Sequence, residues 1–161
     1  YRGVLYAGMM LTAGGPKVLE FNCRFGDPEC QPLMRRLRGD LVEILWATSV
    51  GGLDQVEIEF DDRVACCVVV CSEGYPGSYP KGRPILGIDH AEAQGDVVVF
   101  EAGTKREGED VVTNGGRVLG VTALGADLRS ARDLANEACE QIRFEGAFWR
   151  RDIGGRVLQP V

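Results

Sequence analysis

Three polar side chains alternate with apolar ones in the segment 17–29. Glu20, Asn22 and Arg24 are separated by single apolar residues. Because alternate side chains of a β-strand point to opposite faces, these three would lie on one face, with neighbours about 7 Å apart. Carboxylate and amide oxygens are suitable Mg²⁺ ligands, and a guanidinium can hold a phosphate or carboxylate through two parallel hydrogen bonds. The pattern therefore indicates a site for a metal-bound phosphate or an acyl phosphate.

The residues that follow this strand would add backbone donors to the same site. Gly26 has no Cβ and so permits close approach of a ligand to the backbone. Asp27 is a good N-cap and Pro28 suits the first helical position, so a helix is predicted to begin here, although Pro32 favours a later or irregular start. Free N–H groups at a helix start attract anions. Gly26 and Asp27 are therefore candidate substrate-binding residues.

The same alternation also has a simpler interpretation. A period of two occurs in any half-exposed strand, and Glu, Asn and Arg are common on its solvated face. The residues alone therefore leave two alternatives, a metal and phosphate site or the wet face of a structural strand. In either case the opposite face is predicted to be an apolar core face, formed by Leu19, Phe21, Cys23 and Phe25.

The elements expected to hold this segment come first in the chain. Residues 3–12 are apolar with β-branched and aromatic members, and residues 13–16 have turn composition. A second strand at 17–25 completes a predicted antiparallel hairpin. Asp40 is expected to cap a second helix that runs to about Val50, with an apolar face formed by Leu41, Ile44, Leu45 and Thr48.

From Gln55 onward the composition predicts a β-rich lobe. Strands are expected at 56–60, 63–72, 96–102 and 118–124, with a Pro- and Gly-rich loop at 73–84 and a tight turn at 113–116. Asp127 is expected to cap one long helix whose buried stripe is Leu128, Ala131, Leu134, Ala135, Ala138 and Ile142. We therefore expect an α+β fold in two units, residues 1–53 with a hairpin and helices, and residues 54–161 with the β-rich lobe.

Composition is that of a globular protein. The 161 residues are 45% hydrophobic and 26% charged, with a net charge of -6. No long basic block and no apolar run of membrane-spanning length occurs, so neither nucleic acid nor a membrane is an expected partner. The six cysteines include no C-x-x-C pair and the single His90 is remote from them, so no zinc site is expected. We expect reduced thiols and a cytoplasmic location.

Longer motifs narrow these alternatives. The run Lys17-Val18-Leu19-Glu20-Phe21-Asn22-Cys23-Arg24-Phe25-Gly26-Asp27-Pro28-Glu29 resembles the signature of the glycinamide ribonucleotide synthetases, within the ATP-grasp superfamily. Further segments resemble that family in the same order, at 1–8, 74–77, 102–104, 113–119 and 144–147. The resemblance extends over essentially the whole chain. It implies the C-terminal half of an ATP-grasp domain, an antiparallel hairpin plus helices, followed by a small β-rich, barrel-like lobe with one long helix.

The resemblance also implies a reaction. The family uses ATP as a co-substrate to join glycine to 5-phosphoribosylamine in purine synthesis, through a glycyl phosphate that the amine attacks. Glu20 and Asn22 match the family's ligands for Mg²⁺ or Mn²⁺. Arg24 is the candidate for holding the acyl phosphate. Leu19 matches a residue that packs beneath the adenine, with an ordinary core position as the alternative.

Two other positions bear on this implied site. Several ATP-grasp relatives carry another acidic metal ligand on the preceding strand, where this chain has Gly8. Two side-chain ligands would then remain, with water and phosphate oxygens completing an octahedral Mg²⁺. Arg117, next to the backbone N–H groups of the 113–116 turn, is a candidate for contacting the ribose phosphate. The alternative for that segment is a plain hairpin turn.

The chain contains no phosphate-cradling glycine-rich motif. The resemblance implies another lobe that covers the ATP phosphates and an N-terminal domain that helps to hold phosphoribosylamine. We therefore expect a piece of a longer protein, inactive without its missing N-terminal part. Two other classes stay open: a different ATP-grasp carboxylate–amine ligase or carboxylase, and a non-catalytic binding or assembly domain of the same fold.

Overall fold

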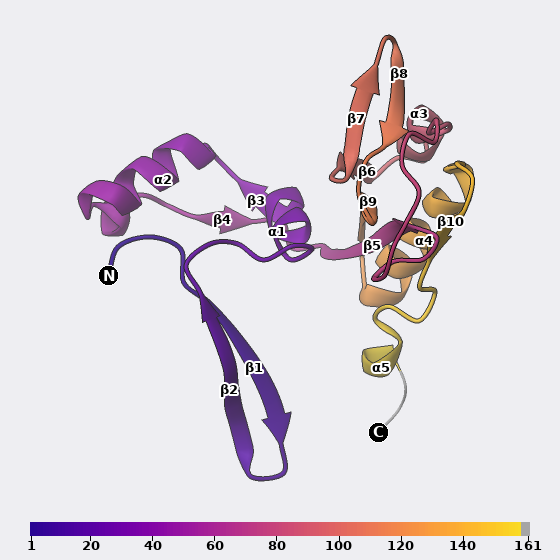
Figure 1. The fold of residues 1–161 in the computed structure, drawn as a ribbon. Coiled ribbons are helices and arrows are strands. Elements are labelled where there is room, and N and C mark those ends of the chain that lie inside the picture. The colour runs from indigo at the N-terminus through magenta and orange to yellow at the C-terminus, as the bar shows by residue number, and fades with distance from the viewer. Residues whose placement is uncertain (159–161) are drawn as a thin grey trace.

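The strand that carries the polar side chains belongs to a projecting hairpin. In the computed structural model, which describes residues 1–158, β1 (Tyr6–Thr12) and β2 (Gly15–Asn22) pair antiparallel, as predicted. Figure 1 shows this hairpin pointing away from the other elements. The predicted core face of the hairpin is wrong for this chain, because Leu19 is 64% exposed, Phe21 is 63% exposed and Cys23 is exposed as well. Only Phe25, beyond the end of β2, is half-buried.

The first helix begins after Pro28, which is the later start that Pro32 favoured. α1 spans Cys30–Arg36 with Glu29 as its N-cap, so Asp27 and Pro28 precede the helix. The N–H of Cys30 donates to the carbonyl oxygen of Gly26 at 2.8 Å. Pro32 is the third residue of α1, where a backbone N–H has no partner within the helix, so its missing donor costs nothing. The free helix start predicted at Asp27 is therefore not formed.

The second helix matches its prediction. α2 (Leu41–Val50) begins where the Asp40 carboxylate accepts hydrogen bonds from the N–H groups of Val42 and Glu43, and it ends at Gly51 in the left-handed conformation. A short 3-10 helix, η1 (Leu53–Gln55), follows. The strand predicted at 56–60 is reduced to β4 (Glu59–Phe60), which pairs with β3 (Leu37–Arg38).

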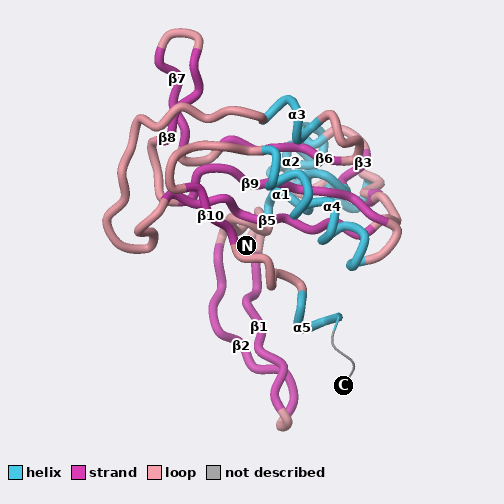
Figure 2. The backbone as a smooth tube through the Cα atoms, turned by 90° about the vertical axis from the view of Figure 1, so that its right-hand side faces the viewer, coloured by secondary structure: helices cyan, strands magenta, loops and turns pink. Residues whose placement is uncertain are grey.

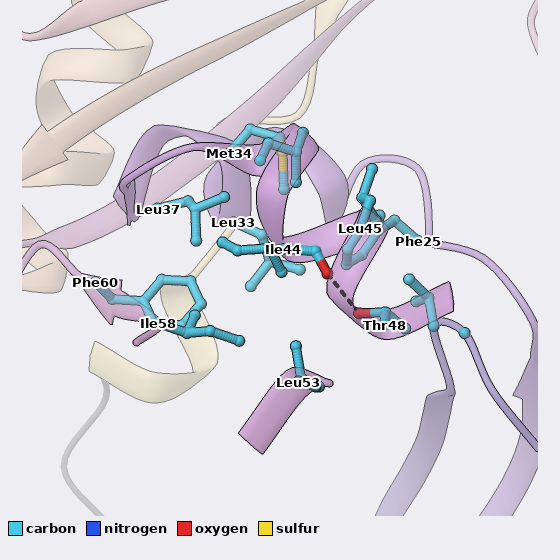
Figure 3. A pocket seen from close by; sticks show the side chains of 13 residues that line it. Phe25, Leu33, Met34, Leu37, Ile44, Leu45, Thr48, Leu53, Ile58 and Phe60 are labelled. Carbon is cyan, nitrogen blue, oxygen red and sulfur yellow. Dashed lines mark hydrogen bonds between the residues drawn. The ribbon is translucent and has the colours of Figure 1, made fainter. Parts of the chain in front are cut away.

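These elements surround an apolar pocket of about 240 Å³. Figure 3 shows side chains from α1, α2 and the 53–60 segment converging on it, among them Leu33, Ile44, Leu53 and Phe60. Thr48 also lines it, and its hydroxyl donates to the carbonyl oxygen of Ile44 at 2.7 Å. The predicted apolar face of α2 is thus confirmed. The pocket has no ionisable lining and is unsuited to phosphate chemistry.

The second part of the chain is built on one antiparallel sheet. Its four strands follow the order β10 (Ala147–Trp149), β5 (Val64–Ser72), β9 (Arg117–Gly125) and β6 (Val97–Glu101). β5 and β9 are therefore the two central strands. Their apolar residues make up much of the core. The β-rich lobe is confirmed, but its sheet is open and does not close into a barrel.

One long helix covers this sheet, as predicted. α4 (Leu128–Gln141) begins at a capping box formed by Asp127 and Ser130. Its residues Ala131, Ala135 and Ala138 are fully buried against the sheet. Small side chains at these positions allow the helix to approach the strands closely. α1 packs against β5 and β9 as well, so the first part of the chain is joined to the lobe.

Several shorter elements were not predicted. α3 (Ile88–Glu92) and α5 (Gly155–Leu158) are short helices, and β7 (Thr104–Glu107) pairs with β8 (Asp110–Thr113) in a hairpin that projects from the lobe in Figure 2. Segment 113–116 therefore connects β8 to β9 across two sheets, and the plain hairpin turn considered for it is wrong. None of the helices within residues 1–158 has the length and apolarity to cross a membrane.

Candidate active site

Glu20 and Asn22 lie side by side on the exposed hairpin. The side-chain Nδ2 of Asn22 donates to Oε1 of Glu20 at 3.0 Å, so the two share one face of β2. A half-turn of the Asn22 amide would place its Oδ1 beside the Glu20 carboxylate. Two hard oxygen ligands at one point then suit a divalent cation of the Mg²⁺ type. The pair therefore fits the metal expected from the sequence.

The opposite strand leaves room for this pair. Gly8 is the β1 partner of Glu20, and a Cβ at this position would lie only 3.0 Å from Glu20 Cγ. Met9 pairs with Val18, so Leu19 is an extra residue in a β-bulge. Within residues 1–158 no group of three or more His, Cys, Asp or Glu side chains could hold a metal ion. Water and phosphate oxygens would have to complete the coordination of a cation held by Glu20 and Asn22.

Arg24 lies just beyond the end of β2 and is exposed. One of its terminal nitrogens, Nη1, donates to the carbonyl oxygen of Phe25 at 3.2 Å. The positive charge of Arg24 partly offsets the raised pKa of the Tyr6 hydroxyl, and Tyr6 is the β1 partner of Asn22. Arg24 therefore lies near the Glu20–Asn22 pair, and its other guanidinium donors make no hydrogen bond within residues 1–158.

Tyr6 is a member of this cluster that the sequence reasoning missed. Its hydroxyl donates to Oε1 of Glu29 at 3.3 Å, a long hydrogen bond. The negative charge of Glu29, followed by burial and a smaller effect of Glu20, raises the pKa of the Tyr6 hydroxyl, while Arg24 opposes this shift. Tyr6 thus lies near the charges of both carboxylates. Its place two residues before Gly8, on the same face of β1, was the signal available in the sequence.

Glu29 is the second residue that the sequence reasoning missed. Its side chain folds over Gly26, where a Cβ would lie 2.3 Å from Glu29 Oε2. Gly26 therefore makes room for a carboxylate. The carbonyl oxygen of Gly26 accepts from the N–H of Cys30, and the predicted substrate-binding role of Gly26 stays a prediction. Glu29 could have been found as the last residue of the signature run.

Asp27 and Arg117, both predicted to contact substrate, contact each other. The Arg117 guanidinium donates to the carbonyl oxygen of Asp27 at 2.9 Å and to its Oδ2 at 3.1 Å. The side-chain amide of Gln31 donates to the other carboxylate oxygen at 3.1 Å. Beside this pair lies a pocket of about 360 Å³, whose lining includes Pro28, Tyr75, Arg117 and Trp149. Asp27 and Arg117 are therefore engaged in joining two parts of the chain.

The buried cysteines of the lobe are not suited to nucleophilic chemistry. All six are free thiols. Burial raises the pKa of Cys67 to about 11 and that of Cys139 to about 12, so both stay protonated near neutral pH. Neither thiol is poised to act as a nucleophile.

Comparison with known proteins adds two family matches. The family model described as "Phosphoribosylglycinamide synthetase, C domain" matches residues 65–156. The model described as "Phosphoribosylglycinamide synthetase, ATP-grasp (A) domain" matches residues 1–30, which include the hairpin with Glu20 and Asn22. The two matches follow one another in the order of the two structural parts.

Individual relatives agree with these matches. The chain is 54% identical over 159 residues to a phosphoribosylamine–glycine ligase of Rhodopirellula baltica, and 52% identical over 159 residues to one of Vibrio cholerae. It is also 52% identical over 159 residues to the trifunctional purine biosynthetic protein adenosine-3 of Gallus gallus. A crystal structure of phosphoribosylamine–glycine ligase from Thermotoga maritima superposes with a TM-score of 0.78 at 35% identity, covering 92% of this chain.

The match covers a limited share of each relative. The aligned residues make up 98% of this chain but 36% of the Rhodopirellula protein, 37% of the Vibrio protein and 16% of the Gallus protein. They cover 36% of the Thermotoga chain. The chain therefore spans just over one third of the bacterial relatives.

Proposed function

Because this chain belongs to the phosphoribosylglycinamide synthetase family, we propose that it supplies the metal-binding part of a phosphoribosylamine–glycine ligase. The proposed reaction converts ATP, glycine and 5-phosphoribosylamine to ADP, phosphate and glycinamide ribonucleotide, by way of glycyl phosphate, in purine synthesis. The observation that carries this proposal is the Glu20–Asn22 pair, hydrogen-bonded on an exposed strand inside the ATP-grasp match.

The site residues have separate roles in this proposal. Glu20 and Asn22 would hold Mg²⁺, or Mn²⁺ in its place, and the bound ion supplies charge neutralisation for the ATP phosphates. Arg24 would hold an oxygen of the acyl phosphate through its free guanidinium donors. Leu19, exposed in the bulge of β2, would contact the adenine ring. Carboxylate, amide and guanidinium act together because they lie near one another.

The rest of the active site would come from outside these residues. We propose that residues 1–53, together with the segment 54–60 that packs with α1 and α2, are the C-terminal part of an ATP-grasp domain and that the C-terminal lobe follows. The exposed apolar side chains of the hairpin, such as Leu11 and Phe21, support a contact with a missing N-terminal part. That part would supply the groups that clamp ATP and help to hold phosphoribosylamine. Six free thiols favour a reducing compartment, and we place the enzyme in the cytoplasm.

The proposal is tested with the intact protein that contains this chain. Release of ADP should require glycine and phosphoribosylamine together, and glycinamide ribonucleotide should form in equal amount. The 161-residue chain alone should release no ADP. Turnover with another acid or amine in preference to glycine and phosphoribosylamine would indicate a different ATP-grasp ligase. Full activity of a Glu20→Ala, Asn22→Ala, Arg24→Ala triple variant would indicate that this face plays no catalytic part.

A further inference from the structure

In the proposed reaction the ammonium group of glycine must be bound, and Glu20, Asn22 and Arg24 have no role in binding it. Glycine enters with a carboxylate, which is phosphorylated, and an ammonium group one carbon away. Arg24 suits the anionic end of this substrate, and the Glu20 carboxylate is directed to the metal. A second carboxylate beside them would be needed to bind the cationic end. The following inference rests on the proposed function and concerns that second group.

Glu29 is a second carboxylate that contacts the same hairpin. It is exposed, and it makes no ion pair with any residue in the described part of the chain. It stands at the N-cap of α1 but its side chain caps no backbone N–H. Instead Oε1 accepts a hydrogen bond from the Tyr6 hydroxyl. The mechanism proposed so far therefore leaves this carboxylate without a role.

Two neighbours fix where this carboxylate lies. Tyr6 is the β1 partner of Asn22, so its hydroxyl ties Glu29 to the strand pair that carries the metal ligands. The absence of a side chain at Gly26 leaves the space that Glu29 Oε2 occupies. The result is a second carboxylate tied through Tyr6 to the strand pair that carries Glu20 and Asn22.

We propose that Glu29, positioned by Tyr6 and accommodated by Gly26, binds the ammonium group of glycine in the ligase reaction. The ammonium stays protonated and donates to the free lone pairs of the Glu29 carboxylate. In glycine a single carbon separates the ammonium group from the carboxylate. Binding of the ammonium group by Glu29 would therefore direct the carboxylate toward Arg24 and the metal-bound phosphate. Acids without an ammonium group would leave Glu29 unpaired, so this contact also favours an amino acid over a simple acid.

The test uses Glu29→Gln in the intact protein, with Glu29→Asp and Tyr6→Phe as companions. Glu29→Gln should raise the KM for glycine by about tenfold or more, as expected for loss of a charged hydrogen bond, and leave the KM for ATP nearly unchanged. Calorimetric titration with glycine should show the same weakening. Glu29→Asp should restore part of the affinity, and Tyr6→Phe should cause a smaller rise in the glycine KM.

Two controls separate this role from a structural one. Glu43→Gln changes another exposed glutamate near a helix start and should leave both KM values unchanged. Gly26→Ala should displace Glu29 and weaken glycine binding in the same way as Glu29→Gln. Each variant is compared with the wild type by thermal unfolding, so that a loss of fold is recognised.

Three results would overturn the inference. An unchanged glycine KM in an active Glu29→Gln enzyme would reject the ammonium contact and leave the proposed function intact. A higher Mg²⁺ requirement with normal glycine binding would assign Glu29 to the metal instead. A wild-type protein that neither binds glycine nor turns it over would reject the proposed function together with this inference.

Discussion

The Arg117 guanidinium donates two hydrogen bonds to Asp27, one to the backbone carbonyl oxygen at 2.9 Å and one to the side-chain carboxylate at 3.1 Å. Asp27 lies in the signature run, three residues after Arg24, and Arg117 begins the central strand β9 of the lobe. The two residues are 90 positions apart in the chain. This contact therefore helps to set the place of the hairpin and its polar face relative to the lobe.

A double-mutant cycle tests the Arg117–Asp27 contact. Both side chains are partly exposed, so the side-chain coupling between Arg117→Ala and Asp27→Asn should be only about 0.2–1 kcal/mol. Urea unfolding of the wild type, both single variants and the double variant measures it. Arg117→Ala should cost more than Asp27→Asn, because only the former also loses the bond to the Asp27 carbonyl. Strictly additive effects would contradict a direct contact.

Much of the fold was predictable because its signals are local. The alternation of apolar and polar side chains predicted the β1–β2 hairpin, and a continuous apolar run predicted β5. Asp40 and Asp127 each mark a helix start through hydrogen bonds that span at most three residues. The shared face of Glu20 and Asn22 was predictable for the same reason, since a strand fixes it without any distant contact.

Features that depend on contacts between distant residues could not be predicted from the sequence. The Arg117–Asp27 pair and the Tyr6–Glu29 hydrogen bond join separate elements, and no local pattern specifies either. The bulge at Leu19 depends on pairing register, which alternation alone does not reveal. The β7–β8 hairpin was missed because β7 is exposed and charged, with no apolar periodicity, and β8 has only four residues. The apolar face of the β1–β2 hairpin was wrongly predicted to be buried. An amphipathic pattern shows that a strand has an apolar face, but it does not show which element, if any, packs against that face.

Acid should selectively weaken the junction around Asp61. Its side chain is only 6% exposed and accepts hydrogen bonds from the side chain and the backbone N–H of Arg63, which hold the pKa of Asp61 well below its ordinary value. A carboxyl whose pKa is depressed on folding stabilises the protein above its unfolded pKa. That contribution is lost as the pH falls below about 4 toward the folded pKa.

Asp61→Asn is therefore expected to lower the melting temperature at pH 7, with the gap to the wild type narrowing below about pH 4. Thermal unfolding across this pH range measures the effect. The adjacent Asp62 is exposed and provides the matched control, since Asp62→Asn should leave stability nearly unchanged at every pH. A gap between wild type and Asp61→Asn that stays constant down to low pH would contradict the assignment.

The core of the lobe should respond strongly to one truncation. Leu119 on β9 is fully buried in the sheet–helix core. Leu119→Ala should reduce the free energy of unfolding by about 2–5 kcal/mol, through lost burial and the cavity left behind. Leu86, which is 65% exposed, provides the control, and Leu86→Ala should change stability by about 0.5 kcal/mol or less. Equal effects of the two substitutions in urea unfolding would contradict the described core.

Replacement of Glu20 should disable catalysis without unfolding the protein. The residue is exposed and bonds within the hairpin only to Asn22, so Glu20→Ala should keep the melting temperature of the intact enzyme. The kcat should fall by roughly two to three orders of magnitude, because one of the two proposed protein ligands to the charge-neutralising cation would be gone.

Glu20→Gln separates the charge of this residue from its shape. It keeps one oxygen ligand, so it should bind Mg²⁺ more weakly and regain part of its activity when Mg²⁺ is raised, whereas Glu20→Ala should not. Gly8→Ala should show a milder form of the same defect, since its Cβ would press on Glu20 Cγ at 3.0 Å. Steady-state rates measured over a range of Mg²⁺ concentrations distinguish the three variants. If Glu20→Ala kept near-normal activity at ordinary Mg²⁺, the cation would have to be held elsewhere, and the shared face of Glu20 and Asn22 would be structural.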